Sequence, residues 1–307
     1  MTFGEKRLQK KFDKIRRLEE EGVLAKKKKR SRAVSKFMGN KLAVIGLAVF
    51  LIILLACIFA PLLTPYAPEA VDLRNLRQPP SLAHPFGTDK VGRDLFARVL
   101  YGGRTSILVA GSGALGGALI GVLLGAFAGY MGGWFDKITM RLSEIFMSFP
   151  QLIMVLVLVT IMGQSTKNII IIFVITGWSG VYRQTRAAML SIREEEYVQA
   201  LHAFGLSNTL ICFKHMLPNA LSPIIVNITI NFAMMILEEA SLSFLGLGVP
   251  MDVPTWGNIL NASQDMYTLQ NSWWIWLPVG TVISLFVMSV SFIGDGIRDT
   301  TDISIQG

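Results

Sequence analysis

The stretch TSILVAGSGALGGALIGVLLGAFAGYMGGW, from Thr105 to Trp134, contains no charged residue. A helix of about 20 apolar residues crosses the hydrocarbon core of a membrane, so this segment can span one and extend beyond it. Within it, glycine recurs at every fourth position, as Gly113, Gly117, Gly121, Gly125 and Gly129. This spacing places the glycines along one helix face, where another backbone can approach closely. We expect a central helix whose glycine face packs inside the molecule; a dimer seam or pathway wall is the alternative.

Five further segments are apolar enough to cross a membrane, in a chain that is 52% hydrophobic and 16% charged, with a mean hydropathy of +0.50. In chain order, they cover residues 42–63, 145–163, 168–182, 220–237 and 273–293. The segment 168–182 is short for a span, so its helix must continue through Arg183, whose side chain then snorkels or faces protein. The sequence therefore predicts an all-α polytopic membrane protein with six transmembrane helices.

Basic residues are shared unequally between the two sides that this topology defines. With the N-terminus in the cytoplasm, 22 Lys and Arg residues lie on the inner side and 7 on the outer side. This bias follows the positive-inside rule, so we expect both termini to be cytoplasmic. We interpret the run KKKKRSR, residues 26–32, as part of an orientation signal attracted to anionic membrane lipid rather than as a nucleic-acid site.

The predicted spans divide the chain into four parts. These are a basic cytoplasmic tail (1–41), a first transmembrane helix with an external segment (42–104), a core with five transmembrane helices (105–300) and a short cytoplasmic tail (301–307). The core is interrupted on the cytoplasmic side by a polar loop at 187–219.

An enzyme is a poor hypothesis for this sequence. There is no G-x-x-x-x-G-K-[ST] motif to cradle nucleotide phosphates and no H-E-x-x-H motif. The three histidines, His84, His202 and His215, have no carboxylate at metal-ligand spacing. Cys57 and Cys212 are too few and too far apart for a thiolate metal site. We therefore predict no catalytic residue, no metal site and no bound cofactor.

The polar loop contains EEEYVQALHAFGLSNTLICFKHMLPN, residues 194–219. Val198, Leu201 and His202 share one face of a helix that Gly205 can end by adopting a left-handed conformation. We expect Ser207 to cap a second short helix before Pro218 begins the next span. Three consecutive glutamates at 194–196 would be repelled by anionic lipid, which favours a protein partner for this helix-turn-helix.

The loop resembles the E-A-A-x3-G-x9-I-x-L-P pattern of permease subunits of ATP-binding cassette importers. Gln199, Ala200 and Leu201 stand at E-A-A, Gly205 stands at the glycine, and Leu217 and Pro218 stand at L-P. His215 replaces the isoleucine, which is similar to the oligopeptide, dipeptide and nickel permease branch. Further stretches resemble that branch: FGTDKVGRDLFARVLYGGRTSI (86–107), EASLSFLGLG (239–248), Trp256 with Gly257, and GDGIRD (294–299).

This resemblance implies a type I importer permease fold in a bacterial or archaeal cell (inner) membrane. It implies four kinds of partner besides lipid: a second related permease, two cytoplasmic ATPases and an extracytoplasmic solute-binding protein. ATP and Mg would be bound by the ATPases, and the loop would dock on them to couple ATP hydrolysis to alternating access. The residues that the resemblance assigns to this coupling loop are Glu195, Glu196, Tyr197, Ala200, Leu201, Gly205, Leu206, His215, Leu217, Pro218 and Asn219.

Two carboxylates, Glu238 and Glu239, stand at the outer end of a predicted span. Charge is expensive there, so each is a functional candidate, although either could be solvated or paired. Glu239 begins a family motif, and the resemblance makes Glu239, Ser241 and Trp256 candidates for the external end of the pathway or its gate; fold stability could equally require Glu239. In the external segment we expect Asp89, Arg93 and Asp94 to form an ion-pair network rather than to contact ligand.

The resemblance leaves the transported solute open. Peptides are the expected cargo, and nickel or another small solute is the alternative within the same branch. A carrier driven by an ion gradient is the alternative from another class. Carriers of that kind often contain paired Gly- or Pro-interrupted spans in corresponding positions of two halves, which this sequence does not show.

Overall fold

The computed structural model describes residues 34–301, and these residues form helices joined by loops, with one isolated bridge between Thr88 and Asp94. Residues 302–307 of the predicted tail 301–307 and residues 1–33 of the basic tail 1–41 therefore lie outside the described residues. The longer helices are α3 (Lys41–Ile58), α5 (Leu95–Met131), α6 (Gly133–Ser148), α7 (Gln151–Met162), α8 (Thr166–Arg193), α11 (Leu217–Phe244) and α14 (Trp273–Thr301). The shorter ones are α4 (Ala60–Leu63), α9 (Glu196–Ala203), α10 (Asn208–Leu210), α12 (Trp256–Asn261) and α13 (Met266–Asn271).

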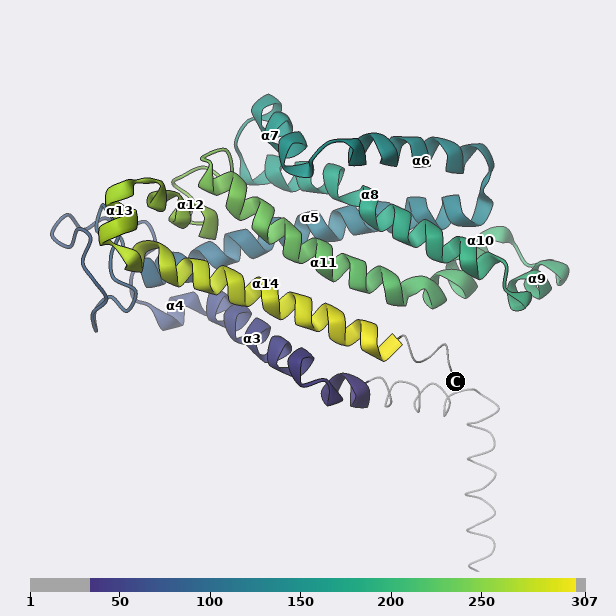
Figure 1. Cartoon of the computed structure of the whole chain (residues 1–307), viewed down its shortest axis with the longest axis horizontal. Coiled ribbons are helices and arrows are strands. Elements are labelled where there is room, and N and C mark those ends of the chain that lie inside the picture. The colour runs from purple at the N-terminus through teal and green to yellow at the C-terminus, as the bar shows by residue number, and fades with distance from the viewer. Residues whose placement is uncertain (1–33, 302–307) are drawn as a thin grey trace, which may run out of the picture.

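Helices α5, α8, α11 and α14 run lengthwise through an elongated molecule (Figure 1). At one end lie α9 and α10, and at the other lie α12, α13 and the loop that joins α4 to α5. Four helical segments are long and apolar enough to cross a membrane: Lys41–Ile58, Leu95–Met131, Asn208–Phe244 and Trp273–Thr300. The number rises to five if α6 and α7 together form one bent span. The prediction of an all-helical protein with several apolar spans is confirmed. Four or five segments of the described residues satisfy the length and composition criteria, so the expected number of six stays a prediction.

The predicted span 145–163 is wrong as a single helix. The chain breaks at Phe149, which has extended backbone (φ −104°, ψ 143°), and at Pro150, so that α6 and α7 meet at an angle of 91°. Proline disfavours helical conformation in the residue before it and has no backbone N–H to donate. The apolar composition continues across the break, which is why hydropathy alone does not reveal it.

Helix α8 contains the predicted span 168–182 and continues through Arg183, as the short apolar stretch requires. Arg183 is exposed, and its Nη1 lies 3.2 Å from the Met147 sulfur of α6. Helix α8 is not among the segments that satisfy the length and composition criteria for a span. Its place in the fold comes from close packing against α5.

The five regularly spaced glycines of α5 all face α8. A Cβ atom placed on Gly121 would lie 2.6 Å from the Trp178 carbonyl oxygen and 2.9 Å from the Tyr182 nitrogen. A Cβ atom on Gly125 would lie 2.7 Å from the Tyr182 carbonyl oxygen. Such distances leave no room for a side chain, so the glycine face brings the two backbones together within one chain.

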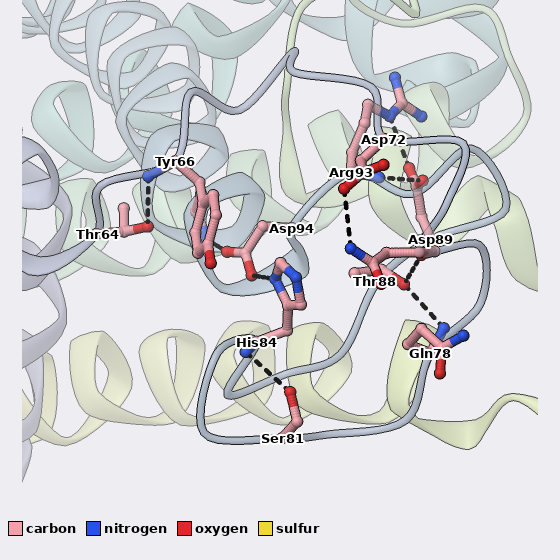
Figure 2. A network of polar contacts seen from close by, with 12 residues as sticks. Thr64, Tyr66, Asp72, Gln78, Ser81, His84, Thr88, Asp89, Arg93 and Asp94 are labelled. Atoms are coloured by element: carbon pink, nitrogen blue, oxygen red, sulfur yellow. Dashed lines mark hydrogen bonds and ion pairs between the residues drawn. The ribbon is translucent and has the colours of Figure 1, made fainter.

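The segment between α4 and α5 has no helix, and side-chain hydrogen bonds to nearby backbone shape it (Figure 2). Asp89 pairs with Arg93 at 2.7 Å, the network that the sequence predicted. Asp94 accepts from the Ala97 N–H at 2.7 Å, which caps α5, and lies 2.8 Å from the His84 ring. The pKa of Asp72 lies below its usual value because the Arg74 N–H and the Asn75 amide donate to its carboxylate.

Candidate functional site

Residues 194–219, which we term the elbow, project at the end of the molecule where α9 lies (Figure 1). Helix α9 ends at Ala203, and Gly205, two residues further on, has a φ of +77°. The Gly205 N–H donates to the His202 carbonyl at 2.9 Å, and the Leu206 N–H donates to the Leu201 carbonyl at 3.3 Å. This is a Schellman-type helix end, for which glycine is favoured because it adopts positive φ without strain. A Cβ on Gly205 would meet nothing within 4 Å, so its requirement is conformational.

The second half of the elbow differs from the prediction. Ser207 occupies the N-cap position but makes no capping hydrogen bond, and α10 passes into a π-helical segment, η1 (Ile211–Met216), and then directly into α11. The prediction of a separate short helix before Pro218 is therefore wrong. The Leu217 N–H bonds to the Cys212 carbonyl five residues earlier. This π-helical turn is wider than an α-helical one and directly precedes Pro218. It allows the helix to continue through Pro218, although proline has no N–H to donate.

The elbow is fastened to the end of α5 by Tyr130, a residue that the sequence analysis missed. The rings of Tyr130 and His202 are stacked, with centroids 5.9 Å apart and an interplanar angle of 2°. The Tyr130 hydroxyl donates to Asn208 Oδ1 at 2.9 Å, and Arg193 Nη1 donates to the Tyr130 carbonyl at 3.2 Å. With the fully buried Val198, these contacts hold the elbow in one orientation relative to the glycine-faced helix. No sequence pattern pairs Tyr130 with a residue 72 positions away.

The predicted coupling residues divide into a packed set and an exposed set. Leu201, Leu206, His215 and Leu217 are half-buried, and Leu201 and Leu206 pack on the apolar cluster around Val198. The exposed ones are Glu195, Glu196, Tyr197, Ala200, Gly205, Pro218 and Asn219. Asn219 is held against the elbow, because its Nδ2 donates to the Tyr197 hydroxyl at 3.1 Å.

Phe204, which the sequence analysis did not select, is the most exposed aromatic side chain of the elbow. Its exposed fraction is 81%, and it stands at the end of α9 beside Gly205. The sequence did contain a signal for Phe204: it is an aromatic residue that lies off the helix face defined by Val198 and Leu201. Phe204 at one end of α9, and Glu195 and Glu196 at the other, leave the elbow with exposed apolar and acidic side chains, a composition suited to packing against a protein.

A groove runs between α8 and α11, starting at the elbow. Its first hollow, about 770 Å³, is lined by residues of the elbow, including Glu195, Tyr197 and Asn219, and by polar residues of α8 and α11. A second hollow of about 340 Å³ shares Asn227 and Ile230 with the first. We term these two adjoining hollows the α8–α11 groove. Because this groove of mixed polar and apolar lining follows α11 away from the elbow, the side chains that turn into it are candidates for contact with a solute.

The external candidates do not form one accessible site. Glu239 is fully buried; Ser106 Oγ donates to it at 2.7 Å and Ser243 Oγ at 2.8 Å. The Trp256 backbone N–H donates to Ser106 Oγ at 3.1 Å, so this cluster joins α5, α11 and α12. Ser241 is exposed and donates to the Leu237 carbonyl within its own helix at 2.7 Å. In this structure Glu239 and Trp256 are out of reach of a solute, and their contacts are those of a structural cluster.

Comparison with known proteins agrees with this architecture. Residues 121–302 match the family described as binding-protein-dependent transport system inner membrane component, and residues 30–80 match the N-terminal transmembrane domain of oligopeptide transport permease C. The chain therefore belongs to the family of permease subunits of ATP-binding cassette importers, in the oligopeptide, dipeptide and nickel branch that its motifs resemble.

Two relatives illustrate the similarity. The dipeptide transport system permease protein of Alkalihalophilus pseudofirmus is 40% identical over 270 residues, which cover 88% of each chain. The oligopeptide transport system permease protein of Bacillus subtilis is 38% identical over 271 residues, again 88% of each chain. Both alignments extend over most of this chain, so the similarity includes the elbow and the α8–α11 groove as well as the glycine-faced helix.

Proposed function

We propose that this chain is the transmembrane subunit of an ATP-driven importer of dipeptides and oligopeptides in a bacterial or archaeal cell (inner) membrane. Family membership supports the class of transporter, and the names of the relatives, which refer to dipeptide and oligopeptide transport, support the cargo. The observation that carries the proposal is the elbow itself. It combines a family motif with a rigid attachment to α5 and an exposed apolar and acidic surface.

In this proposal the elbow faces the cytoplasm and docks on an ATPase, and both chain termini lie on the same side. A second related permease completes the pathway, and a solute-binding protein delivers peptide at the end where α12 and α13 lie. The two partner ATPases bind ATP with Mg and carry out hydrolysis, while this chain catalyses no reaction. When the ATPases close, the two elbows move together, and α5 and α8 transmit that movement because their backbones are in contact.

The α8–α11 groove is the part of the pathway that this chain contributes. It starts beside the elbow, so movement of the elbow changes the groove at its inner end. Alternating access then requires the groove to open toward the cytoplasm in one state and toward the outside in the other.

Uptake by whole cells tests the proposed function. A strain without this chain is complemented with the full-length chain or with an empty vector, and uptake of radiolabelled trialanine is measured with and without depletion of cellular ATP. We expect uptake that needs both the chain and ATP. Uptake that survives ATP depletion but stops when the ion gradient is collapsed would indicate a carrier, and restored uptake of nickel without uptake of peptide would contradict the cargo.

A further inference from the structure

The second hollow of the α8–α11 groove combines two kinds of side chain. Three methionines, Met147, Met154 and Met234, line it together with the amides of Asn227 and Asn231 and of Gln151. Methionine side chains are flexible and polarizable, and they pack against apolar groups of many shapes. Proteins that accept varied partners often use such surfaces. A groove of this composition suits a cargo with a constant polar backbone and variable side chains.

Glu238 continues the groove face of α11. Asn227, Asn231, Met234 and Glu238 follow one another at spacings of four, three and four residues, which places them on one side of the helix. Gln151, which lines the groove, donates to Glu238 Oε2 at 3.0 Å. The carboxylate therefore lies next to the groove, before α11 ends at Phe244.

The surroundings of Glu238 do not give it a structural role. It is half-buried, and the bond from Gln151 is the one interaction that the described residues 34–301 provide for its carboxylate; no Lys, Arg or His of these residues pairs with it. The adjacent Glu239 is fully buried and receives hydroxyl hydrogen bonds from two serines. A carboxylate at membrane depth is costly unless it is paired, so one without a basic partner is expected to meet a cation that comes and goes.

We propose that Glu238 binds the protonated amino terminus of a peptide in the translocation pathway. An ammonium group has three N–H donors and no acceptor, and a carboxylate with one oxygen already held by Gln151 is a matched, oriented partner for it. Asn231 Nδ2 donates to the Gly177 carbonyl at 3.1 Å, which leaves its Oδ1 to accept from a peptide N–H. The methionines receive the side chains. This inference rests on the proposed function, because it takes a peptide as cargo.

The test compares two trialanine derivatives that differ in the charge of the amino terminus. N-methyl-trialanine keeps a protonated amine, whereas N-formyl-trialanine is neutral. Maximal uptake rates are measured at saturating peptide in the complemented strain, so that capture outside the membrane does not limit the rate. For the wild-type chain we expect the charged peptide to enter about tenfold faster, since a hydrogen bond to a charged group contributes about that factor or more.

Glu238→Gln retains an oxygen that accepts from Gln151 and nearly the same volume, so it removes the charge alone. We expect the ratio of the two rates to fall to about one in this variant and to be largely retained in Glu238→Asp. Glu144→Gln is the matched control, since Glu144 is exposed and paired with Arg141 at 2.6 Å, and it should keep the wild-type ratio. If Glu238→Gln fails to accumulate in the membrane, Gln151→Lys replaces it, because an ammonium beside Glu238 should abolish the ratio in the same way.

A wild-type ratio in Glu238→Gln, or equal uptake of both peptides by the wild-type chain, would overturn the proposed binding site while leaving peptide import intact. Failure of the wild-type chain to take up either peptide above the empty vector would instead overturn the proposed function. The two failures are therefore distinguishable.

Discussion

Replacing Gly121 by alanine tests the contact between α5 and α8 at the position where an added Cβ would come nearest to the α8 backbone. The added Cβ would lie 2.6 Å from the Trp178 carbonyl oxygen, 2.8 Å from the Val181 Cβ and 2.9 Å from the Tyr182 nitrogen. Favourable carbon contacts lie at about 3.5–4.0 Å, so the two backbones must separate by roughly 1 Å. Overpacking of this kind typically costs about 1–3 kcal/mol.

Gly111→Ala is the matched control on the same helix. Its Cβ would lie 3.7 Å from the Phe232 ring, which is an ordinary contact. Both variants gain the same helix propensity, about 1 kcal/mol, so this contribution cancels when they are compared. We therefore expect Gly121→Ala to be less stable than Gly111→Ala by about 1–3 kcal/mol in free energy of unfolding.

Denaturant titration of the detergent-solubilised chain measures this difference. Tryptophan fluorescence is a suitable signal, because Trp178 is buried beside the substituted position. Equal stability of the two variants would refute the close approach of α5 and α8 at Gly121. A Gly121→Leu variant should be less stable still, since a larger side chain forces a wider separation.

Two other substitutions test the conformational role of Gly205 and the structural role of Glu239. Gly205→Ala imposes a left-handed conformation on a residue with a Cβ, which costs about 1–2 kcal/mol, so we expect a displaced elbow and reduced peptide-stimulated ATPase activity in the assembled complex. Gly280→Ala on α14, where a Cβ would meet nothing within 4 Å, is its control, and equal activity of the two variants would contradict the role of the left-handed turn. Glu239→Leu leaves the Ser106 and Ser243 hydroxyls without their buried acceptor, so we expect a loss of about 1–3 kcal/mol in free energy of unfolding, whereas Ser241→Ala should change it by less than about 0.5 kcal/mol. A stable Glu239→Leu chain with impaired transport would instead favour a gate.

Regular local patterns allowed the main features of the fold to be predicted. The four-residue glycine period specifies a helix face without reference to the rest of the chain, and the structure shows α8 on that face. The left-handed end of α9 at Gly205 follows in the same way, because glycine has a strong local preference there.

Features that depend on the bonding of particular turns were not predicted. The break at Phe149 and Pro150 lies inside a continuous apolar stretch, so only the proline marks it. Pro218 behaves differently from Pro150, because it stands in the first turn of α11 and the helix continues through it. The π-helical turn before Pro218 has no recognised sequence pattern.

Adjacent residues with the same chemistry were the hardest to assign. Glu238 and Glu239 point about 100° apart on α11, and their surroundings come from residues far away in the sequence, Gln151 for one and Ser106 for the other. The sequence selected Glu239 through its motif, whereas the structure encloses Glu239 and leaves Glu238 beside the groove. Tyr130 was missed for the same reason, because its partners on the elbow are remote in sequence.

Co-purification from detergent-solubilised membranes tests the central claim most directly, with partners identified by mass spectrometry. The wild-type chain is compared with a Glu196→Lys, Phe204→Ala double variant, which alters two exposed elbow residues, and with Leu73→Ala, an exposed residue at the opposite end of the molecule. We predict that the wild-type chain and Leu73→Ala recover a related permease and an ATPase, and that the double variant recovers the permease without the ATPase. Undiminished recovery of the ATPase by the double variant would contradict docking at the elbow, and recovery of no ATPase by the wild-type chain would contradict its place in an ATP-driven importer.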